Sequence, residues 1–110
     1  MITVRVPIRT QNSLNVREHW SSRARRAKSE RKAVGWAMAC TVACPVPCVV
    51  TLTREAKRLM DGDGLQASFK HCRDAVADWL HVNDADPRVE WRYAQVRTKE
   101  YGVVIQVESR

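Results

Sequence analysis

The apolar residues of this chain follow two different periods, and together these restrict the folds that it can adopt. At both ends, apolar residues occupy every second position: Ile2, Val4, Val6 and Ile8, then Val103, Ile105 and Val107. Such alternation is typical of strands with one buried face. From Leu65 to Trp79 an apolar residue recurs every three or four positions, which is the spacing of one helix face. The two periods predict helices packed on a sheet.

The remaining segments complete the expected order of elements. Asn15 and Glu18 form a capping-box-like pair, so a long helix is expected from about Val16 to Thr41. A second strand is expected at 46–53 and a second helix at 64–80. A two-stranded hairpin is expected from 89–93 and 103–107. The sequence thus predicts a single domain, residues 1–110, with an α+β (mixed α/β) fold. Its order is β-α-β-α-β-β, with two helices on a four-stranded mixed sheet.

The charge of the chain favours an anionic partner. Its 19 lysines and arginines exceed its 12 acidic residues, and the formal net charge is +7. No run approaches the roughly 20 apolar residues that cross a bilayer, and the N-terminal segment alternates like a strand. We therefore expect a cytoplasmic protein with no membrane contact.

Four cysteines, Cys40, Cys44, Cys48 and Cys72, could pair in a secreted protein, but free thiols are expected without a secretion signal. Three of them recur at every fourth position. Pro45 and Pro47 interrupt any helix there, and the spacing is not a common zinc pattern. Small buried thiols are the favoured interpretation, and a metal or redox role is the alternative.

The second expected helix has two distinct faces. With 100° per residue, one apolar stripe contains Leu65, Phe69, Cys72, Val76 and Trp79. The opposite face carries Asp63, Lys70 and Asp74, together with the small side chains of Ala67 and Ala77. This face could be the solvated side of an amphipathic helix, with Lys70 and Asp74 as an ordinary pair four residues apart.

Carboxylates also flank this helix, Asp61 before it and Asp84 after it. Each could simply form a turn or cap a helix. Two carboxylates brought to about 4 Å repel by roughly 4 kcal/mol at an effective dielectric of 20. A hard dication such as Mg²⁺ or Mn²⁺ reverses that sign, so the acidic residues predict a metal site.

Three segments resemble the RusA-like Holliday junction resolvases, a family widespread in phages and prophages: Asp61-Gly62-Asp63-Gly64-Leu65-Gln66, the run 70–80, and the run 83–89. The likeness continues upstream in 15–20 and the arginine-rich segment after it. The resemblance implies a metal-dependent endodeoxyribonuclease that resolves four-way DNA junctions. It also implies a homodimer, because resolution requires nicks in two strands.

Carried over residue by residue, the resemblance makes Asp61, Asp63 and Asp84 the ligands of Mg²⁺ or Mn²⁺ and Lys70 the catalytic lysine. Asp74 and Asp86 are possible additional ligands. Two positions differ from the family pattern: Gly64 replaces an asparagine, and Lys70 follows the second acid by seven residues instead of four. Offsets of four and seven share a helix face.

Seven basic residues are concentrated between positions 17 and 32: Arg17, Arg23, Arg25, Arg26, Lys28, Arg31 and Lys32. This cluster suits contacts with DNA phosphates, although solvated surface is the plainer interpretation. Two other functions stay open: a branched-DNA-binding module whose site has decayed, and a metal-dependent nuclease acting on other nucleic-acid structures.

Overall fold

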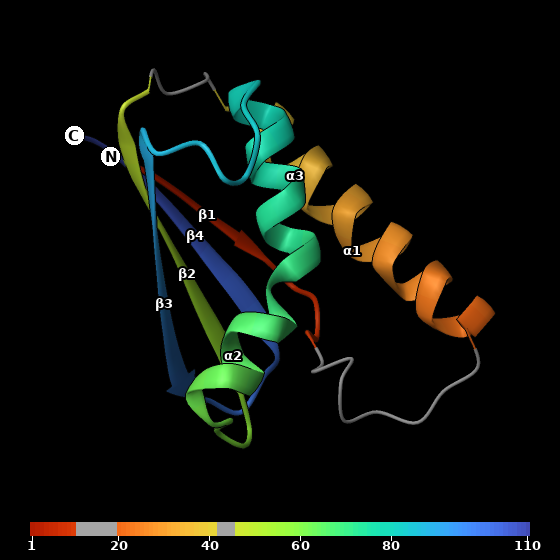
Figure 1. Cartoon of the computed structure of the whole chain (residues 1–110). Coiled ribbons are helices and arrows are strands. Elements are labelled where there is room, and N and C mark those ends of the chain that lie inside the picture. The colour runs from red at the N-terminus through yellow and green to blue at the C-terminus, as the bar shows by residue number, and fades with distance from the viewer. Residues whose placement is uncertain (11–19, 42–45) are drawn as a thin grey trace.

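The computed structural model describes residues 1–10, 20–41 and 46–110. Its elements in chain order are β1 (Ile2–Val6), α1 (Trp20–Ala39), β2 (Cys48–Ala56), α2 (Gly62–Ser68), α3 (Lys70–Leu80), β3 (Val89–Arg97) and β4 (Gly102–Ser109). The helices lie on one face of a four-stranded mixed sheet (Figure 1), which confirms the predicted α+β class. The predicted start of the long helix and its cap fall outside the described residues.

The sheet has the strand order β1-β4-β2-β3. β2 pairs with β3 in parallel from Cys48↔Val89 to Ala56↔Arg97, whereas β4 is antiparallel to both β1 and β2. The predicted hairpin of 89–93 with 103–107 is therefore wrong, because β2 lies between β3 and β4. Alternation identifies a strand with a buried face, but it does not identify the neighbouring strand.

The predicted helix at 64–80 is divided into α2 and α3 at Phe69. Phe69 has φ −95° and ψ 2°, outside the helical region, and the Ser68 hydroxyl donates to the Leu65 carbonyl at 2.7 Å. The Phe69 ring is fully buried and stacks on Tyr93 with 5.9 Å between ring centroids. Packing of this ring against the sheet accounts for the break, since no glycine or proline is present there.

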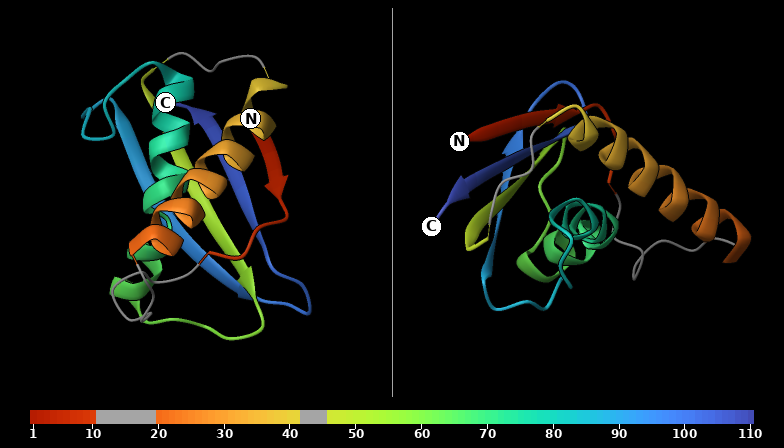
Figure 2. Two further views of the ribbon diagram at one scale, coloured as in Figure 1. Left: turned by 90° about the vertical axis from the view of Figure 1, so that its right-hand side faces the viewer. Right: turned by 90° about the horizontal axis from the view of Figure 1, so that it is seen from above.

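The helices α1 and α3 lie against one face of the sheet (Figure 2), and the buried core residues come mostly from these helices and from the strands. They include Val34 and Met38 from α1, Leu52 from β2 and Ile105 from β4, all with no exposed surface. The apolar stripe expected on the second helix is confirmed at most of its positions. Ala77, which was expected on the polar face, is instead only 3% exposed.

Three of the four cysteines lie in the described residues, and all three are free. Cys48 and Cys72 are buried, as expected, whereas Cys40 is exposed and corrects that expectation. Burial raises the pKa of the Cys72 thiol to about 12. Cys44 lies outside the described residues.

Within the described part of the chain, no helix has both the length and the apolar content that spanning a membrane requires.

Replacing Phe69 with alanine tests the packing at the α2–α3 junction. Because the ring is fully buried, we expect Phe69→Ala to lower the free energy of unfolding by about 3–5 kcal/mol, measured by urea denaturation. Leu59→Ala is the matched control, because Leu59 is 58% exposed. It should change stability by less than about 0.5 kcal/mol. Equal effects of the two variants would contradict this account.

Candidate functional site

Asp61 and Asp63 lie at the start of α2. Asp61 is the N-cap: its carboxylate accepts a hydrogen bond from the Gly64 N–H at 2.7 Å. Asp63 is in the first turn, where a negative charge interacts favourably with the helix dipole. Both residues are exposed. The capping role considered for Asp61 is therefore present, and Asp63 remains open to solvent.

The backbone before Asp61 is fixed by Gln95 of β3. The side-chain amide of Gln95 accepts from the Met60 N–H at 2.9 Å and donates to the Met60 carbonyl at 2.7 Å. Two hydrogen bonds from one amide define both position and orientation. Gln95 thus holds the segment that carries Asp61.

Asp84 lies in the loop between α3 and β3, and Arg73 holds it. The Arg73 guanidinium donates to the Asp84 carbonyl at 2.8 Å and to the Tyr93 hydroxyl at 2.7 Å. Its Nε lies 3.6 Å from a carboxylate oxygen of Asp84. The Trp91 indole N–H donates to the same Asp84 carbonyl at 3.0 Å, and Arg73 lies 4.8 Å from the Trp91 ring centroid. These contacts fix Asp84 beside the middle of α3.

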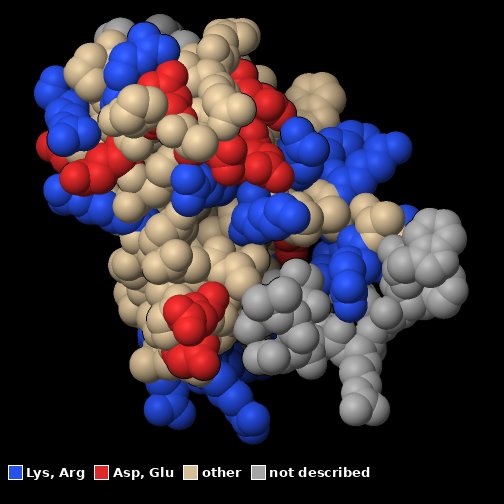
Figure 3. All heavy atoms as spheres, in the orientation of Figure 1, with Lys and Arg blue, Asp and Glu red and all other residues tan. Residues whose placement is uncertain are grey.

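Three side chains of β3 anchor these segments. They occupy every second position, at Trp91, Tyr93 and Gln95, and therefore share one face of the strand. The outer two are four residues apart, or about 13 Å along the strand. Figure 3 accordingly shows acidic side chains over α2 separated from those over α3 and the following loop. Among the described residues, no three Asp, Glu, His or Cys side chains are grouped to hold a metal ion. The structure does not bring Asp61, Asp63 and Asp84 together.

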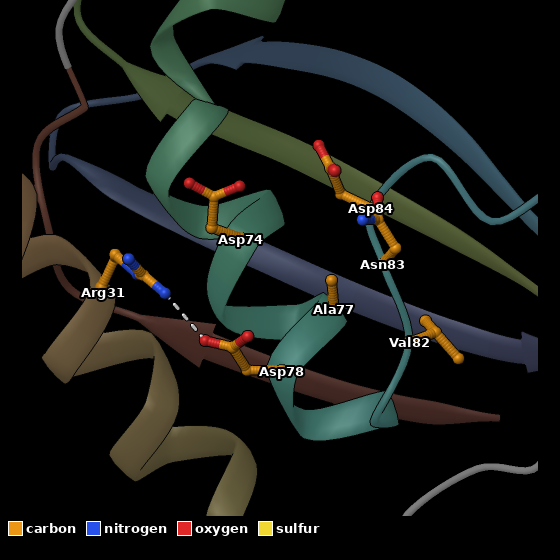
Figure 4. A pocket seen from close by; sticks show the side chains of 7 residues that line it. All are labelled: Arg31, Asp74, Ala77, Asp78, Val82, Asn83 and Asp84. Carbon is orange, nitrogen blue, oxygen red and sulfur yellow. Dashed lines mark hydrogen bonds and ion pairs between the residues drawn. The ribbon is translucent and has the colours of Figure 1, made fainter.

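It does bring Asp84 together with Asp74. Both line a pocket of about 270 Å³ whose other lining residues are Arg31, Ala77, Asp78, Val82 and Asn83 (Figure 4). Asp74 and Asp78 project from α3, Asp84 comes from the loop, and Arg31 reaches from α1 to Asp78 at 2.8 Å. Asp74, predicted as an additional ligand, is thus the partner of Asp84 in this pocket.

Lys70 lines a neighbouring hollow between α1 and α3. This hollow has a volume of about 510 Å³, and its other lining residues are Ala24, Ala27, Lys28, Arg31, His71 and Asp74. Arg31 and Asp74 belong to both cavities. The predicted catalytic lysine and two residues of the predicted DNA-binding cluster therefore meet around one surface that continues to Asp84.

The rest of the basic cluster lies along α1. Arg23, Arg25, Lys28, Arg31 and Lys32 are exposed, and Arg26 is half-buried. Arg17 lies outside the described residues. A helix with this many exposed cations suits contacts with an anionic surface.

Asp86, the other additional candidate, is engaged by Arg88. The guanidinium donates to its carboxylate at 2.8 Å, and this hydrogen bond lowers the pKa of Asp86 to about 2. The Asp86 carboxylate also accepts from the Arg88 backbone N–H at 2.9 Å. Asp86 therefore helps to shape the turn that leads into β3.

The residues that position this site were not identified from the sequence. Arg73 lies inside the segment that resembles the resolvases, and Trp91 and Tyr93 were assigned only to a strand. The sequence contained one signal for them. Trp91, Tyr93 and Gln95 occupy alternate positions and so share one strand face, and each carries a polar group at the end of a long side chain. Their partners are 7 to 35 residues away along the chain.

His71 lines the basic hollow beside Lys70. Burial lowers its pKa, and the charges of Lys70, Arg26 and Arg31 lower it further. Asp74 acts in the opposite direction and raises the pKa. The imidazole at this position is therefore held neutral down to a lower pH than in the unfolded chain.

No protein-family model matches the chain, and no curated protein matches it. The class of protein is defined here by geometry alone: an α+β fold with a basic helix beside a pocket lined by carboxylates.

His71 predicts how stability depends on pH. Because its pKa is lowered in the folded state, the unfolded state binds more protons, and the free energy of unfolding should fall as the pH drops below 6.5. His71→Gln should flatten this dependence between pH 7.5 and 5, measured by urea denaturation. His81→Asn is the control, since His81 is an exposed residue with φ 58°, a conformation that asparagine tolerates. An unchanged slope in His71→Gln would contradict the prediction.

Proposed function

We propose that this protein is a metal-dependent, structure-selective endodeoxyribonuclease that resolves four-way DNA junctions. The observation that carries the proposal is the meeting of Lys70 and Asp74 with Lys28 and Arg31 around one hollow, which continues to Asp84. Cations supplied by two helices can bind the phosphates of a strand, while carboxylates beside them can act on the phosphodiester. The resemblance to the resolvases supplies the branched substrate.

The ligand chemistry suits Mg²⁺ or Mn²⁺, because these ions prefer carboxylate oxygens. The carboxylates occur as two separate pairs, Asp61 with Asp63 on α2 and Asp74 with Asp84 around the pocket. A bound ion would supply charge stabilisation and an activated water. A site formed by Asp61, Asp63 and Asp84 together would require α2 and the loop after α3 to approach each other.

The role of Lys70 follows from its position. It is exposed at the first residue of α3 and lies one helical turn before Asp74. An ammonium there can neutralise the charge that develops on a phosphate oxygen during hydrolysis. Cutting two strands of a junction requires two such sites, so we propose that the working form is a homodimer.

A second candidate is a branched-DNA-binding module without activity. The separation of Asp61 and Asp63 at the start of α2 from Asp84 beside α3 favours it. Both candidates require DNA binding by α1, and only the first requires metal-dependent cleavage. The two are therefore separated by a cleavage assay and not by a binding assay.

The cleavage assay uses a synthetic four-way junction with Mg²⁺ or Mn²⁺. We expect symmetrical nicks. Asp74→Asn and Asp84→Asn should each lower the rate about 100-fold or more, because each removes a carboxylate that would hold the metal ion. Lys70→Ala should have an effect of similar size, because it removes the ammonium beside the reacting phosphate. Glu90→Gln is the matched control. Glu90 lies on β3, where it pairs with Arg92 at 2.7 Å, and the rate should stay unchanged.

Binding of the junction without metal-dependent nicks would assign the protein to the second candidate. Faster cutting of flaps, linear duplexes or RNA than of junctions would instead identify a nuclease for other structures. Loss of binding in any of these variants would place the affected residue in substrate binding.

The basic cluster predicts the salt dependence of DNA binding. Arg25 and Lys28 are exposed on α1, so Arg25→Ala combined with Lys28→Ala should weaken junction binding. It should also lower the slope of log K against log salt by up to about 1.8, because each phosphate contact contributes about 0.9. The slope is measured by fluorescence anisotropy between 50 and 300 mM NaCl. Arg97→Ala with Lys99→Ala, two cations outside α1, should leave it unchanged. The opposite pattern would move the DNA path away from α1.

A further inference from the structure

Trp36 is an exposed aromatic residue on α1 that the proposed nuclease chemistry does not use. Its side chain is 69% exposed, the highest value of the large aromatic residues in the described part of the chain. Single exposed apolar residues are common at protein surfaces, so the meaning of Trp36 depends on the groups that lie beside it.

Trp36 continues a stripe of cations on the same face of α1. At 100° per residue, Lys28, Lys32 and Trp36 lie within about 80° of one another, and Arg25 falls inside that arc. The buried Val34 lies about 160° from both Lys32 and Trp36. We call Arg25, Lys28 and Lys32 the basic stripe. It extends along about 10 Å of helix from Arg25 to Lys32, and Trp36 lies about one turn beyond Lys32.

The cations of the basic stripe are available to a partner. All three are exposed, and none takes part in an ion pair within the described residues. Arg31 differs, because it pairs with Asp78. An anionic ligand can therefore approach the stripe without first breaking an existing salt bridge.

The surface beside Trp36 is shallow and open to solvent. Lys32, Gly35, Trp36 and Ala39 line a shallow hollow of about 380 Å³. A Cβ added to Gly35 would meet no atom within 4 Å, so nothing stands above this part of the helix. A planar group could lie against the ring, bounded by small residues and one ammonium.

Charge decides between the possible occupants. A second copy of the chain would bring a second set of the same cations to this face, which raises the electrostatic cost of that contact. A nucleic acid strand supplies both groups that the face can bind, phosphates for the cations and a base for the ring. The partner that fits is therefore single-stranded DNA.

We propose that Trp36 stacks on an unpaired base of a DNA strand whose phosphates bind the basic stripe. This inference rests on the proposed binding of DNA and extends it, because it assigns to α1 a preference for unpaired bases. A protein that acts at branch points benefits from such a contact, since bases there are more easily unstacked. Stacking on an aromatic side chain tolerates any base, so no sequence preference follows from it.

The test compares two 12-nucleotide single strands, oligo-dT and an abasic strand with the same phosphates. Wild-type protein should bind oligo-dT more tightly, and Trp36→Ala should weaken oligo-dT binding between about 5- and 150-fold while leaving abasic binding unchanged. Trp36→Phe, which keeps an aromatic ring, should retain most of the preference. The salt slope should be equal in all three proteins, because no phosphate contact is altered.

An equal loss on both strands, or no loss on either, would overturn the stacking role while leaving DNA binding intact. If the wild-type protein binds neither strand and no junction, the proposed function fails as well.

Sedimentation velocity tests whether this face mediates self-association instead. A wild-type dimer that Trp36→Ala converts to monomers would assign this face to self-association and overturn the inference. Circular dichroism should be the same in all variants, since the residue is exposed.

Discussion

The parallel pairing of β2 with β3 is the constraint on which the rest of the structure depends. Parallel neighbours need a crossover, and α2, α3 and the following loop supply it between Ala56 and Val89. A crossover returns the chain to the opposite end of the sheet, so Asp61 at its start and Asp84 near its end are separated by topology. The loop folds back along α3, and Arg73 fixes it there, which brings Asp84 level with Asp74 but not with α2.

The helix α1 carries exposed cations and α3 carries carboxylates, and the two sets meet along the border between these helices. The Arg31–Asp78 pair crosses that border, but both side chains are largely exposed, so it contributes at most about 1 kcal/mol to stability. Its larger effect is to occupy one acid and one base, which leaves Asp74 facing Lys70 and Lys28. A net charge of +7 attracts polyanions in general, whereas the acids of the pocket repel them locally.

The sequence was sufficient for features set by local pattern and insufficient for those set by distant packing. Alternation located the strands, but the pattern does not depend on which strand lies alongside, so the pairing of β3 with β2 was not predicted. Helical azimuths placed Lys70 and Asp74 on one face, and both line the hollow between α1 and α3. The break at Phe69, in contrast, depends on a ring that stacks on the sheet and has no local signal. Arg73 and Gln95 act through partners far along the chain.

The exposed thiol of Cys40 gives the chain a natural attachment point. Thiolates are the reactive form of cysteine, and burial holds the Cys72 thiol protonated with a pKa of about 12. Among the described cysteines, an alkylating dye should therefore reach Cys40 before Cys48 or Cys72. The Cys40 sulfur lies 3.5 Å from the Trp36 carbonyl oxygen, one helical turn from the ring. The emission of a fluorophore attached there would change when a ligand binds near this end of α1, and no cysteine would have to be introduced.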